Sequence, residues 1–366
     1  MRLGFDIRKY ADIGIGTYTI QNLLKQYDSF FEGELILFTA PQDLSAVSSA
    51  HRGRVIESPQ PKYSLRELFS LGVLANRAGI DVYHAPHYTL PYGLKSKKVV
   101  TIHDIIHTRF PEFFSTLQRM YARRMIQHAC SSADAIVTIS EHSKNDLLKY
   151  FRVREEKIHV ILQGISERYV PCKSEYERSQ LRNRLNLTGY VILYVGNLKP
   201  HKNLGTLLRA LARLPAKHEY MLVVIGERLD SYPEQMEIVK KLNLEKMVRN
   251  RGRISEDDLI CYYQSADVLV MPSLYEGFGA PAVEAMASGV PVIGSNVSSI
   301  PEVLGDAGLL FDPRDDEQLA RLIESVCHDD ELRRGLVTKG LERSKRFRWK
   351  DCAEKTIDVY SKVLNQ

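Results

Sequence analysis

The chain has 366 residues, of which 44% are hydrophobic and 26% are charged, and this ordinary globular composition excludes a disordered chain, a collagen-like fibre and a coiled coil. Lysine and arginine number 50 and aspartate and glutamate 45, so the net charge is +5. That excess is too small for a dedicated nucleic-acid binder, but it fits a protein that handles phosphates or visits an anionic membrane surface.

The sequence carries no evident signal for export or membrane insertion. No stretch reaches the roughly 18 uninterrupted apolar residues needed to cross a bilayer, and the N-terminal sequence MRLGFDIRKY has no apolar signal core. The five cysteines are scattered and never form a C-x-x-C pair, which argues against a disulfide framework or a zinc site. We therefore expect a cytoplasmic protein.

In the first half of the chain, short apolar runs alternate with helical patterns. Continuous apolarity over roughly four to six residues predicts strands that are buried on both faces. The predicted strands are Arg2–Ile7, Glu34–Thr39, Asp81–Ala85, Lys97–Ile102, Asp134–Ile139 and His159–Leu162. Helical patterns at Ile15–Lys25 and Leu117–Ala129 lie between them. The alternation predicts a parallel sheet with helices on both sides.

A polar segment at residues 170–187 interrupts this pattern, and its latter part predicts a short helix that opens a second domain. The alternation then resumes, with predicted strands at Tyr190–Val195, Tyr220–Gly226, Val248–Arg253, Asp267–Met271, Val290–Gly294 and Gly308–Phe311. We expect two doubly wound α/β domains, residues 1–170 and 171–345, and a C-terminal helix at 346–366 that packs back on the first. Open parallel sheets bind ligands beyond the carboxyl ends of their strands, so a ligand cleft is expected where the domains face each other.

The most informative segment is EGFGAPAVE, residues 276–284, which follows the predicted buried strand Asp267–Met271. Proline suits the first position of a helix, so a helix is expected to begin at Pro281. The partial positive charge at its N-terminus favours a phosphate. The small residues before it let a ligand approach the main chain, and the carboxylates of Glu276 and Glu284 suit the hydroxyls of a sugar.

This segment, followed by A-x-G-x-P-V-I, resembles the E-x7-E region of retaining glycosyltransferases of family 4, which have the GT-B fold of two Rossmann-like domains. The resemblance extends over essentially the whole chain. It implies that Glu276 binds the donor sugar and that Glu284 accepts hydrogen bonds from the nucleotide ribose. It also implies that the main chain of Phe278, Gly279 and Ala280 holds sugar hydroxyls and a phosphate oxygen.

A second motif, NLKPHKN at residues 197–203, follows the predicted strand Tyr190–Val195. Lys202 lies at the start of a predicted helix, where an ammonium group can stabilise the charge on a leaving diphosphate. A lone lysine there is usually a solvated surface residue, but the matching lysine of the family favours the catalytic role. The family commonly has an arginine five residues earlier; this chain has Asn197, and Lys199 is the candidate to supply the missing charge.

In the first domain, His103 and Asp104 follow the predicted strand Lys97–Ile102. The resemblance implies that His103 contacts the donor sugar and helps to orient it. Asp104 is a candidate to fix the imidazole or to approach the acceptor. His84 and His87, at the end of the preceding predicted strand, are further candidates for the cleft.

Four other residues are predicted to contact the donor. Gly14 and Gly16 follow the first strand without completing a dinucleotide-binding fingerprint, and in the family a glycine-rich loop here closes onto the donor phosphate. By resemblance, Arg253 and Ile254 lie near the nucleotide base, while Ser255 is expected to cap the next helix. The sequence has no D-x-D motif and no metal-ligand spacing, so we expect neither a metal nor a cofactor.

The predicted helix Leu117–Ala129 carries Arg119, Arg123 and Arg124 and no acidic residue, and the aromatic segment RFPEFFS, residues 109–115, precedes it. Basic and aromatic groups together suit an anionic membrane surface or a lipid-linked acceptor. The alternative, that the aromatic rings are core and the arginines merely solvated, is equally open.

We therefore predict a retaining, metal-independent glycosyltransferase that moves a hexose from a nucleotide-diphosphate sugar to a glycan or lipid-linked acceptor, peripheral to the inner face of the cell membrane. The segments TIHDIIH and VGNLKPHKN most resemble mannosyltransferases of bacterial surface-polysaccharide synthesis, so GDP-mannose is the expected donor. The alternatives are a sugar-nucleotide epimerase or phosphorylase of the same fold, and a non-catalytic relative that only binds the sugar nucleotide. Asn197 favours the non-catalytic relative.

Overall fold

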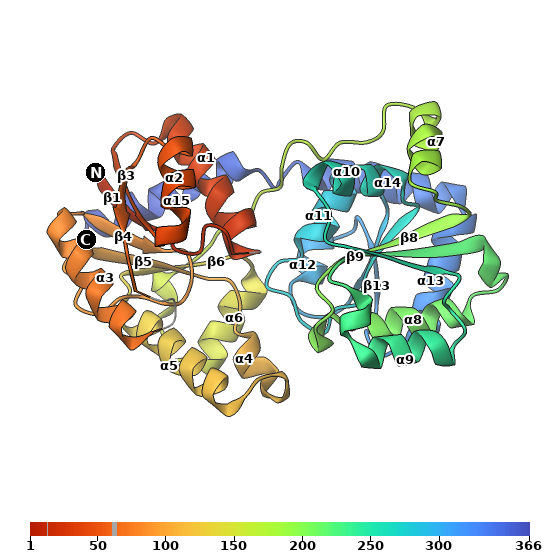
Figure 1. Cartoon of the computed structure of the whole chain (residues 1–366), viewed down its shortest axis with the longest axis horizontal. Coiled ribbons are helices and arrows are strands. Elements are labelled where there is room, and N and C mark those ends of the chain that lie inside the picture. The colour runs from red at the N-terminus through yellow and green to blue at the C-terminus, as the bar shows by residue number, and fades with distance from the viewer. Residues whose placement is uncertain (13, 61–63) are drawn as a thin grey trace. The chain divides into compact units, whose positions relative to one another are not determined.

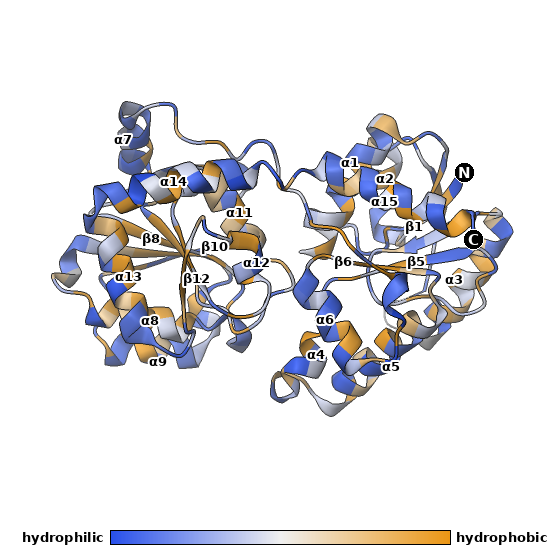
Figure 2. Cartoon of the chain, turned by 180° about the vertical axis from the view of Figure 1, so that it is seen from behind, coloured by the Kyte–Doolittle hydropathy of each residue, from blue (hydrophilic) through white to orange (hydrophobic). Residues whose placement is uncertain are grey.

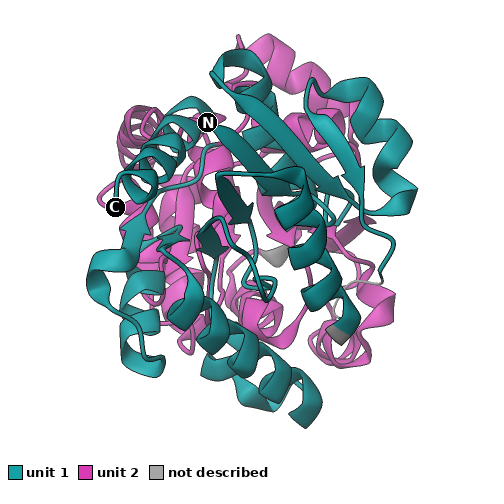
Figure 3. Ribbon diagram, turned by 90° about the vertical axis from the view of Figure 1, so that its left-hand side faces the viewer, with its two compact units in different colours: residues 1–164, 349–366 teal, residues 165–348 magenta. Residues whose placement is uncertain are grey.

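The computed structural model describes residues 1–12, 14–60 and 64–366. The chain forms two compact units: unit 1 comprises residues 1–164 and 349–366, and unit 2 comprises residues 165–348 (Figure 3). The chain enters unit 2 at Ile165 and leaves it at Arg348, and these two residues form a parallel bridge. Each unit is an α/β domain built on a parallel sheet (Figure 1), as the alternation of strands and helices predicts.

Unit 1 contains a seven-stranded sheet in the order β3-β2-β1-β4-β5-β6-β7. Its strands are β1 (Arg2–Asp6), β2 (Glu34–Thr39), β3 (Arg54–Glu57), β4 (Val82–Ala85), β5 (Lys97–Ile102), β6 (Ala135–Thr138) and β7 (Ile158–Val160). Every strand predicted for this half is present. Strand β3 was not predicted, because this edge strand buries none of its four side chains and its sequence RVIE has no continuous apolar run.

Helices cover both faces of this sheet. They are α1 (Gln21–Phe30), α2 (Leu44–Ala50), α3 (Leu65–Ala78), α4 (Ile106–Arg109), α5 (Thr116–Ser132), α6 (Glu141–Tyr150) and α15 (Trp349–Leu364), with short turns η1 (Ile15–Ile20), η2 (Pro41–Asp43), η3 (Pro111–Phe113) and η4 (Glu155–Lys157). The predicted helix at Ile15–Lys25 is a π-helical turn, η1, that continues into α1. Helices α1 and α15 share one hydrophobic cluster with β1, and α3, α5 and α6 share another with β2 and β5.

The terminal helix α15 completes the core of unit 1. Trp349 and Tyr360 lie in the same cluster as β1 and α1. The Tyr360 hydroxyl is 2.8 Å from the Tyr27 hydroxyl and 2.5 Å from Nδ1 of His84. His84, which we expected to line the ligand cleft, is instead fully buried between Tyr360 and Thr101, and this burial lowers its pKa to about 3. It is a neutral core residue.

Unit 2 contains a six-stranded sheet in the order β10-β9-β8-β11-β12-β13. Its strands are β8 (Tyr190–Gly196), β9 (Tyr220–Gly226), β10 (Val248–Gly252), β11 (Val268–Met271), β12 (Val292–Ser295) and β13 (Leu309–Phe311). All of them were predicted. The helices are α7 (Glu175–Arg184), α8 (Leu204–Arg213), α9 (Pro233–Lys241), α10 (Glu256–Ser265), α11 (Ala280–Ala287), α12 (Ile300–Leu304), α13 (Asp316–His328) and α14 (Asp330–Ser344), with turns η5 (Pro200–Lys202), η6 (Lys217–Glu219) and η7 (Leu229–Ser231).

Hydropathy follows the layers of each unit. Figure 2 shows hydrophobic strands at the centre of each unit, and helices that alternate between hydrophobic and hydrophilic positions around them. Such amphipathic helices are typical of a sheet covered on both faces. In the described parts of the chain, no helix combines the length and the apolarity required to cross a membrane.

A buried ionic network joins the end of β1 to the start of α3. Arg8 donates from Nε to Asp6 Oδ1 at 2.8 Å and from Nη2 to Asp6 Oδ2 at 2.6 Å, and its Nη1 bonds Glu67. Glu67 also forms the capping box of α3 with Ser64. The three charged side chains are almost completely buried, so both carboxylates depend on one guanidinium for charge compensation.

Replacing Arg8 with methionine, an unbranched side chain without charge, should destabilise the protein by about 3–5 kcal/mol, because Asp6 and Glu67 then remain buried without their cation. Urea unfolding at neutral pH measures this change. The control Arg54→Met, on the exposed edge strand β3, should stay within about 0.5 kcal/mol of the wild type. Equal effects of the two substitutions would show that the network contributes nothing specific.

Candidate active site

Two loops at the carboxyl edge of the unit 2 sheet carry most of the predicted donor-site residues. One follows β8 and contains η5, and the other follows β11 and leads into α11. Strands β8 and β11 are neighbours in the sheet. The main-chain N–H of Leu274 donates to the carbonyl oxygen of His201 at 2.7 Å. The two loops are therefore held side by side.

Lys202 and Glu276 form an ion pair across these loops. The ammonium nitrogen lies 2.6 Å from Oε1 and 2.7 Å from Oε2 of Glu276, and the Ser273 hydroxyl donates to Oε1 at 2.7 Å. Their side chains are 20% and 11% exposed, respectively. Sequence reasoning assigned Lys202 to the diphosphate and Glu276 to the sugar; the structure brings these two predicted residues into direct contact.

Two serines after β12 hold the backbone of the Glu276 loop. The main-chain N–H of Glu276 donates to Ser298 Oγ at 2.9 Å, and the Ser298 hydroxyl donates to the Glu276 carbonyl oxygen. The Ser299 hydroxyl lies 3.0 Å from the carbonyl oxygens of both Glu276 and Phe278. These serines were not predicted, because they lie 22 and 23 residues after Glu276 in the sequence and only the fold brings them to its loop. They fix the direction in which the Glu276 side chain points.

Helix α11 begins at Ala280, one residue earlier than predicted, with Pro281 in its first turn. The residue before it, Gly279, has a φ of 101°. Residues other than glycine adopt this backbone conformation only with strain. Phe278 is buried, with its ring 5.6 Å from that of Phe347. The loop therefore delivers the main chain of Phe278, Gly279 and Ala280 to the positive end of the helix dipole.

Glu284 lies one turn into α11 and is almost fully buried. Its Oε2 accepts a hydrogen bond from the Tyr263 hydroxyl at 2.8 Å. Burial raises the pKa of Glu284 to about 7, although the bond from Tyr263 acts in the opposite direction. In the ligand-free protein this carboxyl group is thus poised between its protonated and ionised forms near neutral pH.

The side chain of Asn197 forms a hydrogen bond within the loop after β8. Its Oδ1 accepts from the main-chain N–H of Lys199 at 3.2 Å, and its carbonyl oxygen accepts from the Tyr194 hydroxyl at 2.6 Å. The Lys199 side chain is exposed. The asparagine therefore shapes the turn after β8, where an arginine commonly stands in the family.

Arg253 and Ile254 follow β10 at the same edge of the sheet. Nη2 of Arg253 lies 3.9 Å from Oε1 of Glu227, which follows β9 and also accepts a hydrogen bond from Tyr232. Ile254 is half-buried. Ser255 caps α10, as expected, because its hydroxyl accepts from the main-chain N–H of Asp258 at 3.1 Å.

In unit 1, His103 has partners at both ring nitrogens. Nε2 lies 2.9 Å from the Pro86 carbonyl oxygen, so it carries the proton, and Nδ1 lies 3.4 Å from the Gln163 amide nitrogen. Burial lowers the pKa of His103, and the bond to Pro86 offsets part of this effect. Asp104 does not bond the imidazole; its Oδ1 accepts from the main-chain N–H of Ile106 at 3.0 Å, at the start of α4.

The two glycines after β1 have different surroundings. Gly14 is exposed, with a φ of 88° and open space where a Cβ atom would stand. At Gly16, a Cβ would lie 1.9 Å from the Lys9 carbonyl oxygen, so the main chains of the two segments touch. Gly16 is required by packing, whereas Gly14 is free to meet a ligand. His87 and Lys9 line a small pocket together with Asp6, Arg8 and Glu67. This ionic network was not predicted from the sequence.

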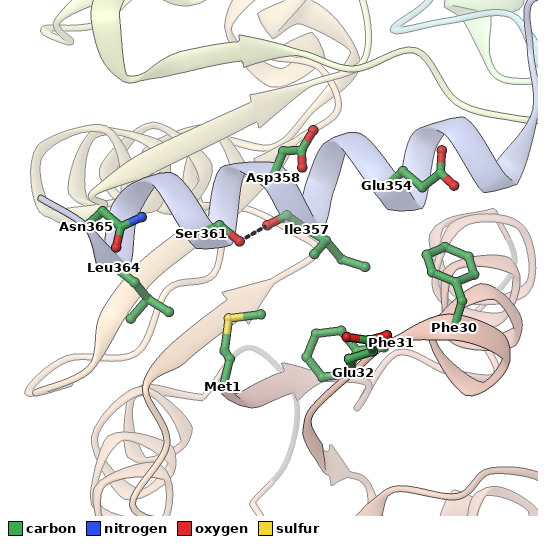
Figure 4. A pocket seen from close by; sticks show the side chains of 10 residues that line it. All are labelled: Met1, Phe30, Phe31, Glu32, Glu354, Ile357, Asp358, Ser361, Leu364 and Asn365. Carbon is green, nitrogen blue, oxygen red and sulfur yellow. Dashed lines mark hydrogen bonds between the residues drawn. The ribbon is translucent and has the colours of Figure 1, made fainter.

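A pocket of about 520 Å³ elsewhere in unit 1 contains none of the predicted residues (Figure 4). It lies between the end of α1 and the outer face of α15. Its charged side chains are those of Glu32, Glu354 and Asp358, and the N-terminal residue Met1 also lines it. Three carboxylates against the single α-amino group of Met1 disfavour a nucleotide diphosphate, so this pocket does not suit the donor.

Two doubly wound α/β domains in one chain are typical of the GT-B fold. Solved structures of this fold are similar: sucrose-phosphate synthase from Thermosynechococcus elongatus (TM-score 0.83, 23% identity, covering 100% of this chain and 99% of that one) and HepE from Anabaena in complex with UDP and glucose (TM-score 0.80, 21% identity, 99% and 100%).

Residues 176–343 match the model of glycosyl transferases group 1, and residues 23–168 match that of glycosyltransferase family 4. The chain is 32% identical to O-antigen chain mannosyltransferase B of Escherichia coli over 96% of its own length and 97% of that protein. The chain therefore belongs to family 4 of the glycosyltransferases, and it is a glycosyltransferase.

Replacing Glu284 with glutamine should stabilise the ligand-free protein at pH 8 and change it little at pH 5. Because the folded-state pKa is raised above the unfolded value, the native carboxyl group binds more protons, and wild-type stability falls as pH rises from about 4.5 to 7. The gain at pH 8 should be at most ~3 kcal/mol. Thermal unfolding of both proteins at both pH values measures it. The same gain at pH 5 would contradict the raised pKa.

Proposed function

We propose that the protein transfers mannose from GDP-mannose to a glycan or lipid-linked acceptor in the synthesis of a surface polysaccharide, with retention of the anomeric configuration. The observation that carries this proposal is the Lys202–Glu276 pair beside the N-terminus of α11. The choice of mannose is supported by the name of the Escherichia coli mannosyltransferase, which is similar to this chain over almost its full length.

The ion pair suggests how the donor enters. Lys202 and Glu276 are largely shielded from water, so in the ligand-free protein each satisfies the other. A diphosphate that takes the ammonium group of Lys202 releases the carboxylate of Glu276, which then accepts hydrogen bonds from the sugar hydroxyls. The main chain of Phe278, Gly279 and Ala280 binds phosphate and sugar oxygens, Glu284 binds the ribose, and Arg253 and Ile254 lie beside the base.

The chemical step needs positive charge on the leaving group. As the bond between the anomeric carbon and the phosphate oxygen breaks, its electron pair moves to the nucleoside diphosphate. Lys202 and the dipole of α11 stabilise that charge, and we propose that they do so without a metal ion or another cofactor. The acceptor hydroxyl attacks the same face of the sugar and gives its proton to the departing phosphate oxygen.

His103 has a supporting role in this proposal. Its proton lies on Nε2, toward the Pro86 carbonyl oxygen, and its burial disfavours the charged form. A neutral imidazole held in this way does not serve as a nucleophile. We propose that it fixes the loop after β5 and orients the sugar, as the resemblance to the family implies.

We place the enzyme in the cytoplasm, at the inner face of the membrane, with a lipid-linked acceptor. The support is the basic helix α5, on which Arg123 and Arg124 are exposed and Arg119 is half-buried, with a bond to Thr116 at 3.3 Å. Phe110 and Phe113 before it are half-buried and stack on each other with ring centres 5.7 Å apart. The side chains of Arg123 and Arg124 are therefore more accessible to an anionic partner than the two aromatic rings are.

Among GDP, UDP, ADP and TDP, GDP should raise the thermal unfolding midpoint most. At a concentration 100 times its Kd, a nucleotide that binds the native state alone adds about 2.7 kcal/mol of stability. A larger shift with UDP would overturn the choice of GDP-mannose and leave the glycosyltransferase activity intact.

Lys202→Ala should lower kcat for acceptor-dependent release of GDP from GDP-mannose by about 10²–10³-fold, because an electrostatic contact to the leaving group is lost. The control Lys240→Ala, on the exposed side of α9, should leave kcat unchanged. A loss with Lys199→Ala would assign to Lys199 the charge that is missing at Asn197. Wild-type turnover that needs no acceptor would instead favour the epimerase. Tight GDP binding without any turnover would favour the non-catalytic relative.

A further inference from the structure

Asn203, the residue after Lys202, precedes α8 without acting as its cap. An asparagine before a helix ordinarily has an extended backbone, and its side chain accepts a hydrogen bond from a main-chain N–H of the first turn. Asn203 has a left-handed backbone, with a φ of 55°, and among the described residues its side chain makes no such bond. Helix capping therefore does not explain this side chain.

The amide group of Asn203 instead joins two other segments of unit 2. Its nitrogen donates to the carbonyl oxygen of Pro272, directly after β11, at 2.9 Å and to that of Pro313, after β13, at 2.8 Å. Its Oδ1 accepts from the Thr206 hydroxyl at 2.9 Å. Because carbonyl oxygens only accept hydrogen bonds, the amide nitrogen is the atom that faces them. The side chain thus links the segments that follow β8, β11 and β13 at the carboxyl edge of the sheet.

This link lies next to both members of the Lys202–Glu276 ion pair. Asn203 adjoins Lys202 in the sequence. Pro272 adjoins Ser273, whose hydroxyl donates to Oε1 of Glu276 at 2.7 Å. The amide group of Asn203 therefore ties the turn that carries the lysine to the loop that carries the glutamate.

The ion pair itself cannot hold the two loops together once a donor binds. In the proposed function, a diphosphate takes the ammonium group of Lys202 away from Glu276. The bonds of Asn203 involve neither charged group, so they persist, as does the main-chain bond between Leu274 and His201. A lysine side chain is a flexible four-carbon stem, so the position of its ammonium group depends on where its main chain is held.

We propose that Asn203 is a positioning residue: its amide group holds the turn that carries Lys202, so that the ammonium group meets the terminal phosphate of a nucleoside diphosphate. The inference rests on the proposed role of Lys202 and adds a side chain that acts through the lysine rather than on the donor itself. An uncharged link suits this role, because it keeps its geometry while the charges beside it change partners.

The relative affinity for GDP and GMP, measured by isothermal titration calorimetry, tests the proposal without an acceptor. GDP carries the terminal phosphate that Lys202 should meet, and GMP lacks it. Lys202→Ala should lower the preference for GDP about tenfold or more, because a charged hydrogen bond is lost. Asn203→Gly keeps the left-handed backbone and removes the amide group, and it should lower the preference about three- to tenfold. If the thermal-shift comparison selects UDP, then UDP and UMP replace this pair.

A double variant separates positioning from a general loss of structure. With Lys202 already replaced by alanine, Asn203→Gly should change the preference for GDP no further, because its route to the phosphate runs through the lysine. Thr206→Val removes the hydroxyl group bonded to Oδ1 of Asn203 and should act in the same direction by a smaller factor. This milder variant carries the test if Asn203→Gly does not fold.

Asn243 offers a matched control in the same unit. It also has a left-handed backbone, with a φ of 56°, but it is exposed and follows α9. Asn243→Gly is the same chemical change at the same backbone conformation, and it should leave both affinities unchanged.

An unchanged preference in Asn203→Gly beside a loss in Lys202→Ala would overturn the positioning role and leave the proposed function standing. No change in Lys202→Ala would overturn the proposed role of the lysine and this inference with it. Equal losses of GDP and GMP affinity in Asn203→Gly, or an equal further loss in the Lys202→Ala background, would show that Asn203 only supports the fold.

Discussion

Every strand in both sheets runs parallel to its neighbours, and the placement of the site follows from this constraint. Parallel strands have all their carboxyl ends at one edge, so segments that are distant in sequence leave the sheet together. In unit 2 the loops after β8 and β11 meet there, and the ion pair between Lys202 and Glu276 fastens one to the other. The β9 and β10 ends bring Glu227 and Arg253 to the same edge.

The ionic groups of the protein fall into two kinds. Arg8 and its two carboxylates are buried and mutually satisfied, which suits a permanent structural role. At the predicted donor site the side chains of Lys202 and Glu276 are 20% and 11% exposed, and burial raises the pKa of Glu284. In the proposed function, these are the three side chains that meet the phosphates and hydroxyl groups of the donor.

The sequence predicted what local patterns encode. Buried strands appeared as continuous apolar runs, and Ser255 and the start of α11 followed from capping and proline rules. Three of the features that were not predicted show the physical reasons. Strand β3 is half-exposed at an edge and lacks the apolar run. Arg8 and Glu67 are 59 residues apart, and no local rule pairs them. His84 is of a residue type common in active sites, but α15, from the far end of the chain, buries it.

That helix, α15, has a consequence for biosynthesis. It supplies Trp349 and Tyr360 to the core that β1 and α1 begin, so the first 164 residues leave the ribosome without the cover that their sheet requires. All of unit 2 is translated before this cover arrives. At about 5–20 residues per second, the unfinished core waits for roughly ten to forty seconds while unit 2 is translated. The core of unit 1 can therefore be completed only after the whole of unit 2 has been synthesised.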